Sequence, residues 1–215
     1  MRRSRTRTLA GVAATALPGL VVFALAARAR ADEGEFRLAL GGGATIALEH
    51  AGGVEGSPGA GWTARGRFAY GLSNTVEIGA LMSYGVAANL RFTNARIDGQ
   101  GGTLFADLAT LALGPEVRVT PGVALGRAFA RTGPYVAARV GAALAMKTSQ
   151  ELLDAESLLV LTPGDDLSVR PFAAGAVGVE HRFGDHAFFS AELAYVVMPD
   201  GGRFEATGEF AWSWY

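Results

Sequence analysis

Apolar and polar residues alternate with period two in eight segments of the chain after residue 33. Successive side chains of a β-strand point to opposite faces, so this pattern predicts strands with one apolar and one polar face. No helical periodicity accompanies it, and Ser73-Asn74 reads as a tight turn between two segments. The eight predicted segments are 36–49, 62–72, 76–91, 105–119, 135–146, 173–182, 189–197 and 204–214.

Charged residues in these segments fall almost entirely on the polar face. The apolar face carries only Asp107 and, near a turn, His181. Chance would scatter charges over both faces, so we infer that the environment excludes charge from one face of every strand. The polar-face charges are Arg37, Arg65, Arg67, Arg91, Arg118, Arg139, Arg182, Glu49, Glu77, Glu116, Glu180, Glu192, Glu205 and Glu209.

Two barrel architectures could impose this rule. A soluble barrel of lipocalin type points its apolar face inward, whereas an outer-membrane barrel points it toward lipid and keeps a polar interior. The second is favoured because small residues dominate the polar face, its arginines and glutamates balance, and segments of about 9–11 residues match tilted transmembrane strands. Aromatics near segment ends are typical of the girdles at membrane interfaces. They are Phe36, Trp62, Tyr70, Phe92, Phe105, Phe183, Tyr195, Trp212 and Trp214.

The first thirty residues differ from the rest. Arg2, Arg3, Arg5 and Arg7 precede an uncharged run over residues 8–27, and Ala29-Arg30-Ala31 follows it. This order of basic, apolar and small residues predicts a secretory signal peptide over 1–31 and a mature barrel over 32–215. An uncleaved anchor is the alternative, since about 20 apolar residues suffice to cross a bilayer.

Composition excludes several function classes. The chain has no cysteine, so a disulfide framework, a thiolate zinc site and a cysteine nucleophile are ruled out. The formal net charge of −1 argues against a nucleic-acid partner, because phosphate binding needs a basic surface. No phosphate loop, nucleotide fingerprint or paired metal ligands appear, so we expect neither a cofactor nor a metal.

The chain resembles the small OmpA/OmpX-like family of eight-stranded outer-membrane β-barrels of Gram-negative bacteria. The resemblance rests on the signal peptide, the even number of strands and the last segment, Phe204-Glu-Ala-Thr-Gly-Glu-Phe-Ala-Trp-Ser-Trp-Tyr215. The resemblance implies an antiparallel up-and-down transmembrane barrel, both termini periplasmic, in contact with outer-membrane lipid and monomeric. It also implies that Tyr215 is a signal for the barrel-assembly machinery. Tyr215 is one residue out of phase with the alternation ending at Trp214, and 120–134 is long for a periplasmic turn.

This topology puts four loops outside the cell, at 50–60, 93–103, 148–168 and 198–203. The loop 148–168 is the longest, is acidic, and carries five leucines that could form a short amphipathic piece over the barrel mouth. We interpret it as the candidate surface for an extracellular partner, against the alternative of an ordinary solvated acidic loop.

The main functional hypothesis is a structural or surface-interaction barrel, with no enzymatic activity, whose lumen is closed by an Arg/Glu network. The alternatives are a narrow channel, a soluble lipocalin-like periplasmic binder, and a lipid A-modifying enzyme using His181, His186, Ser190 and Glu192. The predicted network comprises Arg37, Arg65, Arg67, Glu77, Glu116, Arg118, Arg139, Glu180, Arg182, Glu192, Glu205 and Glu209.

Overall fold

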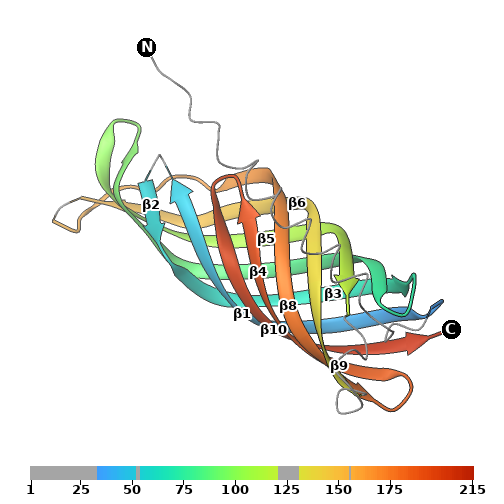
Figure 1. Cartoon of the computed structure of the whole chain (residues 1–215). Helices are drawn as coiled ribbons and strands as arrows, with labels where there is room; N and C mark the ends of the chain where they lie inside the picture. The colour runs from blue at the N-terminus through green and yellow to red at the C-terminus, as the bar shows by residue number, and fades with distance from the viewer. Residues whose placement is uncertain (1–32, 52–53, 121–130, 155) are drawn as a thin grey trace.

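The structure, a computed structural model, describes residues 33–51, 54–120, 131–154 and 156–215. The predicted signal peptide and most of the segment 120–134 lie outside these residues. In the described part no helix is long and apolar enough to cross a membrane. Its strands are β1 (Phe36–Ala51), β2 (Val54–Ser57), β3 (Gly59–Gly71), β4 (Val76–Ile97), β5 (Gln100–Val119), β6 (Thr132–Leu153), β7 (Leu159–Leu161), β8 (Asp166–Phe183), β9 (Ala187–Met198) and β10 (Gly201–Trp214) (Figure 1).

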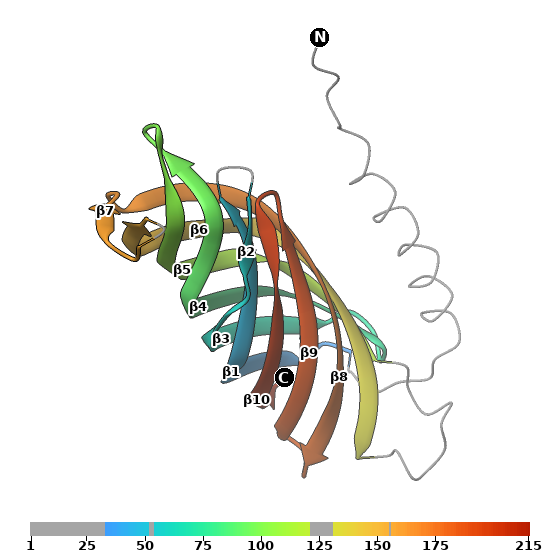
Figure 2. The same ribbon diagram turned by 90° about the vertical axis from the view of Figure 1, so that its left-hand side faces the viewer.

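Eight of these strands form the wall of a closed barrel. Each pairs antiparallel with the next long strand along the chain, in the order β1, β3, β4, β5, β6, β8, β9, β10. The first and last strands then pair with each other, from Phe36↔Trp214 to Glu49↔Gly201, which closes the ring (Figure 2). The predicted fold class, an eight-stranded antiparallel up-and-down barrel, is confirmed. The short strands β2 and β7 are additions at the end opposite the paired termini of the barrel.

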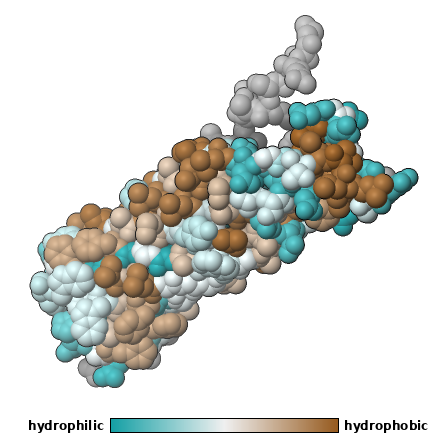
Figure 3. Space-filling view, turned by 180° about the vertical axis from the view of Figure 1, so that it is seen from behind, coloured by the Kyte–Doolittle hydropathy of each residue, from teal (hydrophilic) through white to brown (hydrophobic). Residues whose placement is uncertain are grey.

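Large apolar side chains cover the outside of this wall, and charged ones fill its inside. The exposed fractions of Leu40, Leu113 and Leu193 are 65%, 59% and 63%, whereas those of Arg67 and Glu77 are both 2%. Figure 3 shows hydrophobic side chains spread over the outer surface. A soluble barrel would not present so large an apolar surface to water, so the lipocalin-type alternative is excluded and the wall is that of a transmembrane barrel.

The outward aromatic side chains gather at two levels of the wall. Near the termini, the Phe36 ring packs against Tyr70 and Trp214 at centroid distances of 4.9 and 6.3 Å. Further toward the hairpin end, Tyr195 packs against Phe204 at 4.5 Å. Each level is a group of aromatic rings like those that flank the hydrocarbon zone of a membrane barrel. Of the predicted girdle, Tyr70, Trp212 and Trp214 lie at the first level, and Trp62 and Tyr195 at the second.

Strand β4 reverses its inside and outside faces near the hairpin end. The backbone N–H of Asn89, whose φ is 60°, donates to Asp107 Oδ1 at 3.0 Å beside an irregularity in the β4–β5 register. An extra residue at a bulge shifts the alternation by one, so every later side chain changes face. The prediction that Leu90 and Phe92 face outward and Arg91 inward is therefore wrong: the first two are fully buried and Arg91 is exposed.

Beyond this bulge, strands β4, β5 and β6 continue as a lobe with its own apolar interior. We call residues 90–108 and 147–153 the hairpin lobe. The positive φ of Ser149, 52°, accompanies a matching register shift between β5 and β6. The lobe is therefore apolar inside and polar outside, as a water-soluble sheet is. Its inner cluster contains Leu90, Phe92, Ala95, Leu104, Ala106, Leu108 and Leu152, together with Ala47 and Ala87 from the wall.

The four predicted outer loops are shorter than expected. The segment 93–103 is almost entirely strand, with a tight turn at Asp98 and Gly99, which have φ of 51° and 82°. The segment 148–168 is largely strand, with β7 paired to β6. Leu152 and Leu161 of this segment contact the inner cluster of the hairpin lobe, whereas Leu158 and Leu159 are exposed. Asp98-Gly99 is a sequence that accepts two positive φ angles, which explains why the hairpin tightens there.

Candidate functional site in the barrel lumen

A network of arginine and glutamate side chains crosses the half of the lumen nearer the termini. One of its central acceptors is Glu192, whose carboxylate receives Arg65 Nη1 at 2.6 Å, Arg139 Nη2 at 2.7 Å and the Tyr135 hydroxyl at 3.0 Å. These groups come from strands β3, β6 and β9, so the contacts bridge the lumen from wall to wall. Arg139 Nε also donates to Glu116 at 2.5 Å, which extends the chain to β5.

The same network continues toward the termini. Arg37 pairs with Glu77 at 2.6 Å, Glu35 at 2.9 Å and Glu180 at 3.1 Å, which links strands β4 and β8 through one guanidinium. Arg67 pairs with Glu77 from the other side at 3.0 Å. We call the following set the lumen network: Glu35, Arg37, Arg65, Arg67, Glu77, Glu116, Arg118, Arg139, Glu180, Glu192 and Glu209.

Arg118 occupies the centre of the network. Its guanidinium stacks over the Tyr135 ring at 4.0 Å and reaches Glu180 at 3.3 Å and Glu209 at 3.5 Å. A planar, permanently charged group that both stacks and donates several hydrogen bonds suits this crowded position. Glu209 also contacts Arg65 and accepts the Ser190 hydroxyl at 3.3 Å, so a single carboxylate joins three strands.

The balance of charge is what permits this interior. Isolated ions buried away from water are strongly unfavourable, and pairing with hydrogen bonding offsets most of that cost. Glycine on β1 supplies the space: a Cβ on Gly41 would lie 2.2 Å from the Gly208 carbonyl oxygen and 2.7 Å from Glu209 Cγ. The abundance of small residues on the polar face therefore makes room for long charged side chains opposite.

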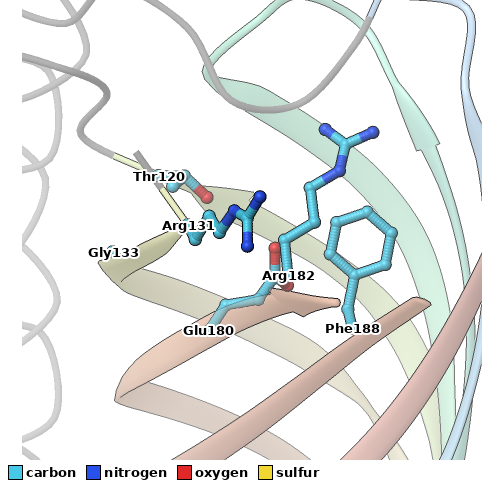
Figure 4. Close-up of a pocket in the computed structure, with 6 residues that line it drawn as sticks. All are labelled: Thr120, Arg131, Gly133, Glu180, Arg182 and Phe188. Atoms are coloured by element: carbon cyan, nitrogen blue, oxygen red, sulfur yellow. The ribbon is translucent and has the colours of Figure 1, made fainter. Parts of the chain in front are cut away.

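The lumen network contains ten of the twelve predicted residues, and the other two, Arg182 and Glu205, lie toward opposite ends of the lumen. Arg182 lies at the termini end, where it donates to the carbonyl oxygens of Gly184 and Asp185 and stacks over Phe188 at 5.1 Å (Figure 4). Glu205 lies nearer the hairpin end and pairs with Arg203 at 2.7 Å.

The sequence interpretation missed one member of the lumen network, Glu35, and one residue that contacts it, Tyr135. Glu35 precedes the first predicted strand. Its position two residues before Arg37 places it on the same strand face, and this spacing could have predicted their contact. Tyr135 was placed on the polar face but given no role, although its hydroxyl binds Glu192.

The pocket beside the network at the termini end, shown in Figure 4, measures about 10 Å³, which is room for roughly one water.

The residues considered for lipid A chemistry do not form a catalytic group. The Ser190 hydroxyl donates to Glu209 inside the lumen, while His181 bonds to Thr132 at 2.7 Å on the outward face. The His186 ring packs against Trp212 at 5.9 Å. A serine nucleophile needs a base within hydrogen-bond reach, and the described contacts give Ser190 no histidine partner.

Toward the hairpin end the lumen holds a second, looser group of charges. Glu49 Oε2 accepts Arg170 Nη1 at 2.9 Å and lies 3.7 Å from Lys147 Nζ. Arg203 Nη2 reaches the Ser83 hydroxyl at 3.4 Å. These four charged residues come from β1, β6, β8 and β10. Glu49 lies within a predicted segment and Lys147 and Arg203 lie directly beside one, whereas Arg170 precedes the segment 173–182 by three residues.

A closed eight-stranded wall with an apolar exterior and an ion-paired interior defines the class of small transmembrane β-barrels. Solved structures share this fold. Neisserial surface protein A is 13% identical, with a TM-score of 0.55 over 84% of this chain and 99% of its own. The outer membrane protein OprG from Pseudomonas aeruginosa is 12% identical, with a TM-score of 0.52 over 86% of this chain and 97% of its own. No protein-family model and no curated protein matches the sequence.

Proposed function

We propose that this chain is an outer-membrane protein of a Gram-negative bacterium, monomeric, closed to ions and active in surface interaction. The fold it shares with OprG and with Neisserial surface protein A supports the location. The termini would face the periplasm, Tyr215 would engage the barrel-assembly machinery, and the hairpin lobe would project into the medium, where the segment 148–168 contributes to the surface offered to a partner.

The lumen network is the observation that supports a barrel closed to ions. Its side chains are buried and reach across the lumen, so an ion entering from either end meets paired guanidinium and carboxylate groups instead of continuous water. Eight-stranded barrels have interiors just wide enough for side chains to fill. Opening a path would require several of these pairs to part together, which favours a barrel that does not conduct.

Planar-bilayer recording of the mature chain 32–215 tests the closed state. We expect no conductance steps above baseline from the wild-type protein. The triple variant Arg65→Ala, Arg139→Ala, Glu192→Ala should introduce steps, because it removes the contacts that bridge β3, β6 and β9. Arg91→Ala, outside the lumen, is the matched control and should stay silent. Wild-type steps of the same size as those of the triple variant would replace this proposal with a channel.

Cell fractionation tests the location. The protein should remain with outer-membrane material and migrate faster in electrophoresis before heating than after, as folded barrels do. Recovery of the mature chain as a soluble periplasmic protein would contradict the proposal.

A further inference from the structure

A pocket of about 340 Å³ opens in the barrel mouth between the hairpin lobe and the β9–β10 turn. This volume corresponds to about ten waters and lies within the range of about 300–1,000 Å³ found for small-ligand sites. We call it the mouth pocket. Its lining residues are Ala95, Arg96, Ile97, Leu104, Lys147, Gln150, Asp166, Ser168, Arg170 and Asp200.

Lys147 gives the mouth pocket a positive charge held by two weak contacts: its ammonium lies 5.7 Å from the centre of the Phe92 ring, a cation–π contact, and 3.7 Å from a Glu49 carboxylate oxygen. The residue is 7% exposed, yet its ammonium makes no hydrogen bond to the described residues. Among the described residues, the ammonium of Lys147 forms an ion pair with Glu49 Oε2. The distance of 3.7 Å is beyond hydrogen-bond distance, and the same oxygen already accepts a hydrogen bond from Arg170 at 2.9 Å. A buried ammonium has three donors to satisfy, so this arrangement favours an anionic group beside Lys147.

Other lining residues add donors and acceptors around this charge. Arg170 Nε donates to the Ser168 hydroxyl at 3.0 Å and lies 3.8 Å from Asp200, whose side chain is 60% exposed. The Gln150 amide donates to the Gly164 carbonyl oxygen at 2.6 Å, which leaves its own oxygen as an acceptor. Exposed Arg96 adds a second guanidinium without an ion pair to the described residues.

Part of the lining of the mouth pocket is apolar. Ala95, Ile97 and Leu104 belong to or pack against the inner cluster of the hairpin lobe, so this wall is backed by a packed core. A ligand that fits therefore needs one apolar face, several hydroxyl groups around its edge, and one anionic substituent. The pyranose ring of an acidic sugar has this distribution, whereas an inorganic anion has neither the apolar face nor the size.

We propose that the mouth pocket binds an acidic sugar unit, with its carboxylate, sulfate or phosphate on Lys147 and Arg96 and its hydroxyls on Gln150, Asp166 and Asp200. The proposal deepens the surface-interaction role and rests on it. Its failure is distinguishable from failure of the closed state, because binding and conductance are measured separately on the same folded protein.

Isothermal titration calorimetry of the mature chain in detergent micelles tests this site, with glucuronate as the probe. We expect glucuronate to bind at least about tenfold more tightly than glucose, which lacks the charge, and than acetate, which lacks the ring. Methyl glucuronide should match glucuronate if the unit comes from a glycan, and should bind more weakly if the free acid is the source. Equal affinity for glucose and glucuronate, or no heat from glucuronate, would overturn the proposal.

Lining variants assign the binding to this pocket. Lys147→Met should weaken glucuronate binding by about tenfold and Lys147→Arg should retain most of it, while Arg96→Gln should weaken it by about threefold. Arg91→Gln is the matched control, since it removes an arginine from the lobe surface outside the pocket. Heat-modifiable migration verifies that each variant is folded. Unchanged affinity in folded Lys147→Met and Arg96→Gln proteins would place any binding elsewhere and refute the site.

Discussion

The barrel wall and the hairpin lobe are built from the same strands with opposite polarity. In the wall, Leu113 and Leu193 face outward while Arg67 and Glu77 are buried. In the lobe, Phe92 is buried and Arg91 is exposed. The difference shows that the polarity of the outer strand face depends on the medium that surrounds it. Lipid outside the wall favours apolar side chains on that face, and water outside the lobe favours polar ones.

The boundary between the two regions is a backbone bulge that occurs on both β4 and β6, the two strands that flank β5. Positive φ angles at Asn89 in β4 and Ser149 in β6 accompany register shifts at the same level of the barrel. Because each shift exchanges the two faces, a continuous strand can leave the membrane and enter water with only a local interruption of its pairing.

The largest effect is expected from removing charge inside the wall. Glu192→Leu should lower the free energy of unfolding by about 3–5 kcal/mol, because Arg65 and Arg139 would stay buried without their shared carboxylate. Urea unfolding in lipid vesicles, followed by heat-modifiable migration, measures the change. Glu151→Leu, at an exposed site in the lobe, is the control. Similar small losses in both variants would break the contrast between wall and lobe.

Adding charge to the outside of the wall should have the next largest effect. Leu40→Arg should cost about 2–4 kcal/mol in the same measurement, since it carries a guanidinium into lipid. Leu158→Arg, at an exposed leucine beyond the wall, should cost about 0–1 kcal/mol. If the Leu40 variant folds as well as the wild type, the assignment of inside and outside faces is wrong.

A smaller loss should follow from filling the space beside the network. Gly41→Ala should destabilise the barrel by about 1–3 kcal/mol, because the new methyl would overlap the Gly208 carbonyl and the Glu209 side chain. Gly66→Ala is the matched control, since the first atom its Cβ would meet is Leu40 Cδ2, 3.5 Å away. Equal stability of both variants would show that the network does not need the β1 glycines.

The smallest expected effect lies at the boundary itself. Asp107→Ala removes the acceptor of the Asn89 N–H and should cost about 0.5–1.5 kcal/mol, with faster amide exchange over β4 beyond the bulge. Asp107→Asn retains an acceptor oxygen and should recover most of the protection. Unchanged exchange in the alanine variant would show that the bulge forms without this hydrogen bond.

The alternation predicted most of the wall because it depends only on neighbours in sequence. It identified the eight long strands and the buried positions of Arg37, Arg118 and Glu209 from period-two spacing. It gave the wrong face to Leu90 because a bulge leaves only a weak trace in sequence. Asp107, the exception on the apolar face, was the visible sign of that bulge, and its meaning required the Asn89 contact.

The sequence by itself determined the strands, their two unlike faces and the concentration of charge on one of them, since these follow from side-chain direction along an extended chain. The alternation alone allowed either face to point inward, and only the small residues and the balanced charge of the polar face favoured a polar interior. The tertiary structure decided that question, and also which glutamate meets which arginine and that Lys147, Arg170 and Arg96 surround one cavity. These contacts depend on the closure of the ring between β1 and β10, because closure places strands that are distant in sequence on opposite sides of a common interior.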